Sequence, residues 1–184
     1  MKALTLSVNG VYYSSTVNVI YYQEIVWHRR PSTFKSILPR RPSVSARSRV
    51  RFLITGDNST GSIAAFELMV PAAQRLPAPA HSHDHYEETI YGIDGVLTWT
   101  VDGKQIDVAP GQALCIPRGA IHRFDNHGSR EVKALCVITP AAIGPHYFRE
   151  SAAVINAAGG GPPDRVKMTE IMRRHGLTPA PPQA

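Results

Sequence analysis

The chain of 184 residues is long enough for one domain with a substantial core, and 43% hydrophobic and 18% charged residues are typical of a soluble globular protein. Two cysteines are too few for a disulfide scaffold, the apolar runs are too short to cross a membrane, and no secretory signal is recognisable. We therefore expect a cytoplasmic protein without a membrane partner.

The formal net charge of +6 is unevenly distributed along the chain. Residues 1–50 contain eight Lys or Arg and one acid, whereas residues 51–184 contain twelve Lys or Arg and thirteen acids. A protein surface that binds the phosphate backbone of a nucleic acid needs its positive charge on the folded domain. The charge distribution therefore predicts no nucleic-acid partner.

Residues 1–50 are predicted to be a basic, flexible segment. Residues 28–49 are rich in Arg, Ser and Pro, contain no acid, and show no period of 2 or 3.6 residues. The Arg/Ser bias also resembles an organelle transit peptide. Another alternative is that the first codon lies upstream of the natural start, and that the natural product begins near Val50. A functional anchor is a further alternative. We expect the folded domain to begin near residue 51.

Residues 51–150 are predicted to contain short strands separated by turns. Asp102-Gly103 predicts a tight hairpin, because both residues tolerate a positive φ. Cys115 and Cys136 lie in apolar strand-like runs, so we expect buried free thiols. Many short strands without a helical period indicate an all-β sandwich or barrel. The predicted strands are Ile63–Val70, Glu88–Ile93, Val96–Val101, Gln105–Val108, Ala113–Ile116, Ala120–Phe124 and Glu131–Thr139.

Residues 151–184 are predicted to form a linker, a short helix and a Pro-rich tail. Apolar residues at helical spacing indicate an amphipathic helix from about Asp164 to His175. Asp164 can cap the start of this helix, and Gly176 can end it. We expect the helix to pack on the barrel or on a second subunit.

Two short segments carry the functional signal. The first contains His81, His83 and Glu88, and the second contains His122. Alternation along a strand directs His81 and His83 to one face, and a hairpin between the segments would bring His122 near. Imidazole and carboxylate suit Mn, Fe, Co, Ni, Cu and Zn, and the donor set does not choose among them. Four donors would leave positions open for water, oxygen or a chelating substrate, as in a catalytic site.

The spacing of these residues resembles the two-part signature of the cupin superfamily, HxHxxxxExxxxxxG followed by GxxxxxPxGxxHxxxN. The fifteen residues between the two parts are similar to the short connection of compact single-domain cupins. One position departs from the pattern, because Arg75 stands where the first motif usually opens with glycine. The matching residues are His81, His83, Glu88 and Gly95, then Gly111, Pro117, Gly119, His122 and Asn126.

The resemblance implies a single all-β cupin barrel, a double-stranded β-helix (jelly roll) over about residues 51–150, with a short C-terminal helix. It also implies turn-shaping roles for the glycines and Pro117, and a structural role for Asn126. Small cupins commonly pair through their outer sheets, so a homodimer is expected by the same resemblance. The implied ligands of one divalent transition metal are His81, His83, Glu88 and His122.

Several neighbours of the motif residues are not expected to bind the metal. His85 continues the alternation of the first histidines, but it is expected near the ligands or in solvent, and Glu87 lacks the matching separation. Other histidines expected on the surface are His28, His127 and His146. Residues that could line a cavity or simply pack in the core are Tyr91, Trp99, Ile116 and Phe124.

An open metal site in a mostly apolar barrel suits activation of dioxygen or of a chelating oxygen substrate. Glu88 could bind the metal and also take a proton from a substrate hydroxyl. The chain looks most similar to quercetin-dioxygenase-like small cupins, which implies an oxidoreductase for a small flavonol- or enol-like substrate. The alternatives are a cupin isomerase, decarboxylase or lyase, and a non-catalytic metal-containing module that binds a small molecule.

Overall fold

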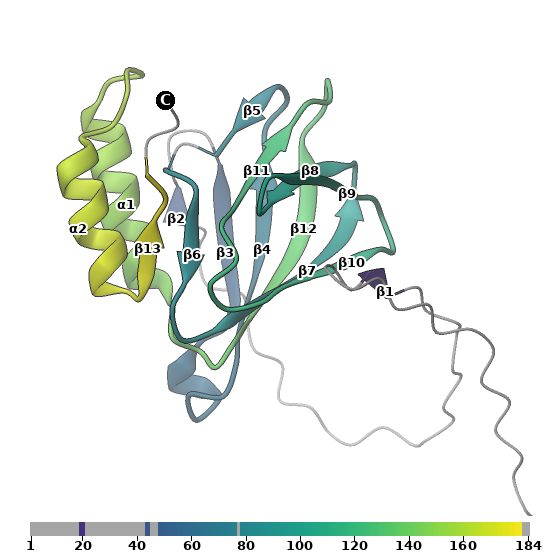
Figure 1. Ribbon diagram of the computed structural model, residues 1–184, viewed down its shortest axis with the longest axis horizontal. Coiled ribbons are helices and arrows are strands. Elements are labelled where there is room, and N and C mark those ends of the chain that lie inside the picture. Colours follow the sequence, from purple (N-terminus) through teal and green to yellow (C-terminus); the bar gives the residue numbers. More distant parts are fainter. Residues whose placement is uncertain (1–18, 21–42, 45–47, 77, 182–184) are drawn as a thin grey trace, which may run out of the picture.

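The computed structural model describes residues 19–20, 43–44, 48–76 and 78–181. Most of the predicted flexible segment therefore lies outside the described residues, as does His28. The described chain forms two antiparallel sheets and two α-helices (Figure 1). None of the helices in this described part is both long and apolar enough to span a membrane.

The larger sheet has seven strands, and the smaller sheet faces it. In spatial order the larger sheet contains β1 (Val19–Ile20), β10 (Ala113–Ile116), β7 (Glu87–Asp94), β12 (Val132–Thr139), β4 (Ala64–Val70), β3 (Arg49–Ile54) and β2 (Ser43–Val44). The smaller sheet contains β13 (Leu177–Pro179), β6 (His81–His83), β11 (His122–Asn126), β8 (Leu97–Val101) and β9 (Lys104–Val108), with β5 (Gln74–Arg75) also paired to β11. This arrangement confirms the predicted all-β jelly roll.

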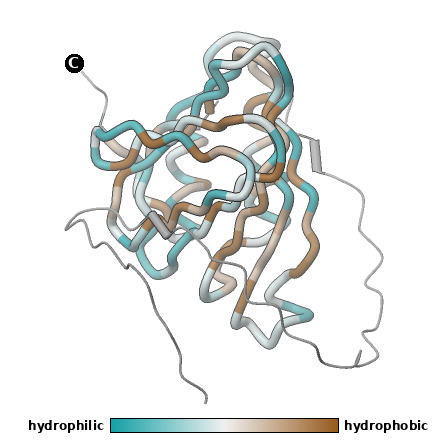
Figure 2. Tube along the Cα trace, turned by 90° about the vertical axis from the view of Figure 1, so that its right-hand side faces the viewer, coloured by the Kyte–Doolittle hydropathy of each residue, from teal (hydrophilic) through white to brown (hydrophobic). Residues whose placement is uncertain are grey.

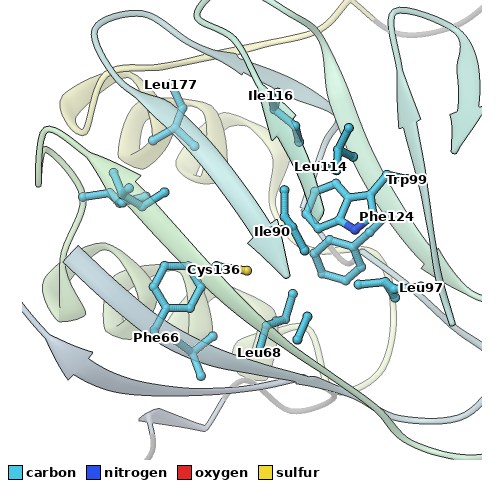
Figure 3. Packing of buried hydrophobic residues seen from close by; sticks show 14 of the residues in the cluster. Phe66, Leu68, Ile90, Leu97, Trp99, Leu114, Ile116, Phe124, Cys136 and Leu177 are labelled. Carbon is cyan, nitrogen blue, oxygen red and sulfur yellow. The ribbon is translucent and has the colours of Figure 1, made fainter. Parts of the chain in front are cut away.

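The hydrophobic core fills the space between the two sheets. Phe66 and Leu68 extend from the larger sheet, and Trp99 and Phe124 extend from the smaller sheet (Figure 3). Hydrophobic and hydrophilic residues alternate along many strands, as expected when one face of each sheet is covered (Figure 2). Each large side chain buried in this way contributes about 1.5–3 kcal/mol relative to an exposed one.

The predicted turns position the strands as expected. Asp102 and Gly103, with φ of 47° and 79°, join β8 to β9 in a hairpin. Gly95, with φ of 73°, lies in a different kind of turn. It connects β7 in the larger sheet to β8 in the smaller sheet and does not form a hairpin. The strand predicted from Ala120 begins at His122, because the turn that includes Gly119 (φ 79°) extends further than the pattern showed.

The predicted C-terminal helix is confirmed as α2 (Arg165–Arg174). The Asp164 side chain accepts hydrogen bonds from the backbone N–H groups of Val166 and Lys167, which are otherwise unpaired at a helix start. Gly176 follows the helix with φ of 73°. The residues after it, predicted as a tail, form β13 along β6.

A second helix, α1 (Pro145–Ala157), was not predicted from the sequence. Pro145 occupies the first turn, where its missing N–H costs nothing. Few side chains of this helix are buried, namely Tyr147, Ser151 and Ala152, so its apolar stripe is too narrow to recognise. The helix crosses residue 150, where the sequence placed the end of the barrel. Figure 1 shows α1 and α2 side by side, and they pack against β2 and β13.

The barrel also uses residues before the expected start at residue 51. β3 begins at Arg49, and Val50 is buried in the core. The two-residue strand β2 pairs with β3 through Ser43 and Val44. The larger sheet therefore includes described residues of the region that the sequence assigned to the basic segment.

Candidate metal centre

Three histidines converge from adjacent strands of the smaller sheet. His81 and His83 occupy the two ends of β6, and His122, the first residue of β11, is the direct cross-strand partner of His81. The ring centroid of His122 lies 4.7 Å from that of His81 and 4.5 Å from that of His83. One nitrogen from each ring lies within 4.8 Å of the other two, so these three histidines could hold one metal ion.

Glu88 approaches the same cluster from the larger sheet. Its Oε2 atom lies 3.6 Å from Nε2 of His122 and 3.9 Å from Nε2 of His83. The chain bends between β6 and β7, where the buried Tyr86 ring stacks on His83 with centroids 4.3 Å apart. The two facing sheets therefore bring all four predicted donors to one place.

Backbone carbonyls fix the protonation of two imidazole rings. Nδ1 of His81 lies 3.0 Å from the carbonyl oxygen of Pro79, and Nδ1 of His122 lies 3.0 Å from that of Ala120. A carbonyl only accepts hydrogen bonds, so Nδ1 carries the proton in both rings. The Nε2 lone pairs remain available, in the orientation that metal-binding histidines usually have.

Burial keeps two of the imidazoles in the neutral form that binds metals. It lowers the pKa of His81 to about 3 and that of His83 to about 4, so both imidazoles are neutral near pH 7. Burial alone would raise the pKa of Glu88, but the neighbouring imidazoles outweigh it, and this pKa is lowered. Neutral nitrogens with one carboxylate fit a divalent transition metal.

The four donors open on an apolar cavity of about 110 Å³. Its wall combines side chains from both sheets, from β13 and from α1, and no Lys or Arg is among the described residues that line it. The polar lining groups besides the donors belong to Ser48, Trp99, Tyr147 and Ser151. Burial raises the pKa of Tyr147 to about 12, so its phenol is neutral. The lining therefore offers no positive charge outside the metal centre.

Two of the predicted wall residues line the cavity. Trp99 and Phe124 do so, whereas Ile116 is buried in the core outside the lining. The Tyr91 side chain was misplaced by the prediction, because it is 42% exposed. Cys136 is a buried free thiol as predicted, but Cys115 is only partly buried.

The predicted non-ligands lie away from the cluster. His85, Glu87 and His127 are exposed, and Glu87 lies 3.9 Å from the Nε atom of Arg118. His146 is exposed as expected, but it has partners in Glu150 and His175 that the sequence did not reveal. The separation of four residues between His146 and Glu150 was the available signal for the first partner.

Asn126 has the structural role that the motif implied. Its Nδ2 atom lies 2.8–3.0 Å from the carbonyl oxygens of Val70, Pro71 and Arg130, and its Oδ1 atom accepts a hydrogen bond from the N–H of Gly128. The side chain is 2% exposed. One buried amide therefore joins the end of β11 to the loops beside it.

Arg75 does not need to be glycine in this fold. It lies in the short strand β5 opposite Asp125, and its Nε atom lies 3.0 Å from the carboxylate of Asp125. The positive φ in this turn, 52°, belongs to Ala73. The departure from the motif therefore leaves strand β6, with His81 and His83, intact.

Cavity residues from α1 and β13 were not identified from the sequence. Tyr147, Phe148 and Ile155 come from α1, and Leu177 comes from β13. Their contact with the cavity depends on how segments distant in the chain pack. No local spacing in the sequence signals that contact.

Comparison with known proteins supports the resemblance seen in the motifs. Residues 68–138 match the cupin domain family. The chain is 25% identical over 122 residues to the tetracenomycin polyketide synthase protein TcmJ of Streptomyces glaucescens, covering 66% of this chain and 81% of that protein. It is 29% identical over 109 residues to the quercetin 2,3-dioxygenase of Bacillus subtilis strain 168, covering 53% of this chain but only 31% of that protein.

A solved structure shares the fold. The crystal structure of a predicted oxalate decarboxylase from Thermotoga maritima superimposes with a TM-score of 0.51 and 17% sequence identity. The superposition covers 56% of this chain and 99% of that one. At this identity the likeness concerns the barrel and not the reaction.

Proposed function

We propose that the protein is a metal-dependent enzyme of the dioxygenase type with a cupin barrel, because residues 68–138 match the cupin domain family. The observation that carries the proposal is the convergence of four donors from two sheets on one apolar cavity. The proposed ligands of one divalent transition metal are His81, His83, Glu88 and His122.

The cavity lining supports a substrate that is small, mostly apolar and chelating through oxygen. Aromatic and aliphatic side chains form most of the wall, and no described lining residue is a Lys or Arg. A phosphate or second carboxylate away from the metal would be buried without a counter-charge, which is costly. A flavonol- or enol-like compound avoids that cost. The likeness to a protein named quercetin 2,3-dioxygenase supports the same substrate class.

Residues of the chain would then position the substrate and accept its proton. A bound divalent transition ion would supply Lewis acidity towards the substrate hydroxyl and redox capacity towards dioxygen. Glu88 is the carboxylate in the lining, so its Oε2 atom can accept the hydroxyl proton. Trp99 has a buried Nε1–H without a hydrogen-bond partner in the described chain, which can donate to a substrate oxygen.

Oxygen uptake tests this proposal. Protein loaded separately with Fe, Mn, Co, Ni or Cu is incubated aerobically with flavonols and simple enols. We expect substrate-dependent uptake with at least one metal, and loss of that uptake in Glu88→Gln with the fold retained. Glu87→Gln, which changes the exposed neighbour, serves as the matched control. His122→Ala should lose metal as well as uptake.

A non-catalytic module that binds metal and a small molecule is the second candidate. It is favoured by the composition of the lining, because Glu88 is its one carboxylate among the described residues and would itself bind the metal. Such a module would bind metal in full yet consume no oxygen with any substrate. An isomerase or lyase would convert the substrate without oxygen uptake, which analysis of the products detects.

A further inference from the structure

A second group of metal-binding side chains lies outside the cavity, where α1 meets α2. His146 and Glu150 belong to α1, and His175 follows α2 directly. Nδ1 of His146 lies 2.8 Å from Oε1 of Glu150, and Nε2 of His175 lies 3.5 Å from Oε2 of Glu150. One donor atom from each residue lies within 4.8 Å of the other two.

The two helices hold these donors together for separate reasons. Residues four apart on a helix lie one above the other, so His146 and Glu150 face the same side of α1. His175 caps the C-terminus of α2, and its ring centroid lies 5.9 Å from that of His146. The donors are thus distant along the chain but adjacent in space.

We propose that His146, Glu150 and His175 form a second metal site, for a divalent ion of the zinc type. Two imidazoles and one carboxylate are a donor set that zinc accepts, with water completing the coordination. The site shares no residue with the cavity and does not depend on the reaction proposed above. Its ion would link α1 to α2.

Arg174 currently competes for the carboxylate of this group. Its Nη2 atom donates to Oε2 of Glu150 over 2.8 Å. The Arg174 side chain is 62% exposed, so it can turn into solvent when an ion binds. An ion pair with one exposed partner contributes little to stability, so losing it would cost little when an ion binds Glu150.

The proposed site lies directly behind the cavity wall. Tyr147, the residue after His146, lines the cavity, and its ring centroid lies 5.4 Å from that of His175. An ion between α1 and α2 would therefore restrain the helix that provides Tyr147. The ion would stabilise the wall without contacting the substrate.

Zinc titration of the full chain tests the proposal. We expect His146→Gln to bind one equivalent of zinc fewer than the wild type, or to bind that equivalent at least about 100-fold more weakly. The His146 side chain is 74% exposed, so this variant should fold normally. His127→Gln, another exposed histidine, is the matched control and should retain every equivalent.

A thermal shift measurement provides the second readout. Excess zinc should raise the melting temperature of the wild type and of His127→Gln more than that of His146→Gln, because ligand binding stabilises the folded state. Equal zinc stoichiometry, affinity and thermal shift in all three proteins would overturn the proposal. The barrel centre cannot mimic the expected result, because it is intact in each protein.

Discussion

At the scale of single residues, Gly95 and Gly103 have similar backbones but different surroundings. Their φ angles are 73° and 79°. A Cβ atom on Gly95 would lie 2.8 Å from Cγ2 of Val132, whereas one on Gly103 would meet nothing within 4 Å. Gly95 is therefore required by both its conformation and its packing.

Alanine substitution should separate the two requirements. Gly103→Ala should lower the free energy of unfolding by about 1–2 kcal/mol, the cost of a left-handed conformation. Gly95→Ala should cost about 1–3 kcal/mol more, because the added methyl overpacks the core. Urea denaturation of both variants measures the difference, and equal losses would contradict the contact with Val132.

The clustering of the candidate metal donors could be predicted from the sequence, whereas part of their surroundings could not. His81, His83 and His122 lie at fixed separations within two motifs. Because side chains alternate along a strand, the separation of two residues places His81 and His83 on the same face. Tyr147 and Leu177 reach the cavity only because α1 and β13 return to the barrel. That return depends on long-range packing, which no local pattern encodes.

At the scale of secondary-structure elements, β13 supports the strand that carries two of the donors. Leu177 pairs with His83, and Pro179 pairs with His81. On its other side, β6 pairs with β11 through a single pair of residues, His81 and His122. The position of β6 therefore depends strongly on β13.

Truncation should reveal this dependence. Deleting residues 177–184 removes β13 and the buried Leu177, so we expect a lower melting temperature and a loss of most bound metal. Deleting only residues 182–184 leaves β13 in place and serves as the control. Equal metal content in the two truncated proteins, measured by elemental analysis, would show that β6 holds its geometry alone.

Glu67 links three strands of the larger sheet. Its carboxylate lies 2.7 Å from Nε of Arg51 on β3 and 2.8 Å from Nζ of Lys133 on β12. Burial raises the pKa of Glu67, but the two cations outweigh it, so the pKa lies below the ordinary 4.5. This stabilisation is therefore complete above about pH 4.5 and is lost as the pH falls through the lowered value.

Glu67→Gln should reproduce that loss at neutral pH. We expect a fall of about 1 kcal/mol in the free energy of unfolding at pH 7, and a difference from the wild type that vanishes in acid. Glu131→Gln is the control, because Glu131 pairs with Arg49 while both side chains remain about half exposed. A difference that is independent of pH in denaturation experiments would refute the electrostatic origin.

Element prediction succeeded where a pattern repeats and failed where it does not. Alternating strands and the capped helix α2 were recognised, because each carries a periodic signal. Helix α1 buries few side chains, and the two-residue strand β2 is too short for any period. These elements are defined by the barrel they pack against.

At the scale of the whole molecule, the start of the folded unit differs from the change in composition. Arg, Ser and Pro dominate up to residue 49, yet β3 begins at Arg49 and Val50 is 6% exposed. Amino-acid composition describes the average polarity of a whole segment. It does not reveal that the end of such a segment pairs with a strand.

Two N-terminal truncations should locate the functional boundary. Deleting residues 1–50 removes β1, β2 and the first two residues of β3, including the buried Val50, which should lower the melting temperature by about 5 °C or more. Deleting residues 1–42 removes β1 but retains β2 and all of β3, and it should have a much smaller effect. Calorimetry compares them, and identical curves would support a boundary at residue 51.

The pairing of β13 with β6 also orders events during biosynthesis. The ribosome makes His81, His83, Glu88 and His122 well before it makes residues 177–179, and α1 and α2 also come between. While translation continues, a nascent chain would thus expose its candidate donors and an apolar cavity that β13 does not yet cover. Binding of the proposed ion should therefore follow the synthesis of β13, and a chain stalled on the ribosome before that strand would expose apolar surface that chaperones bind.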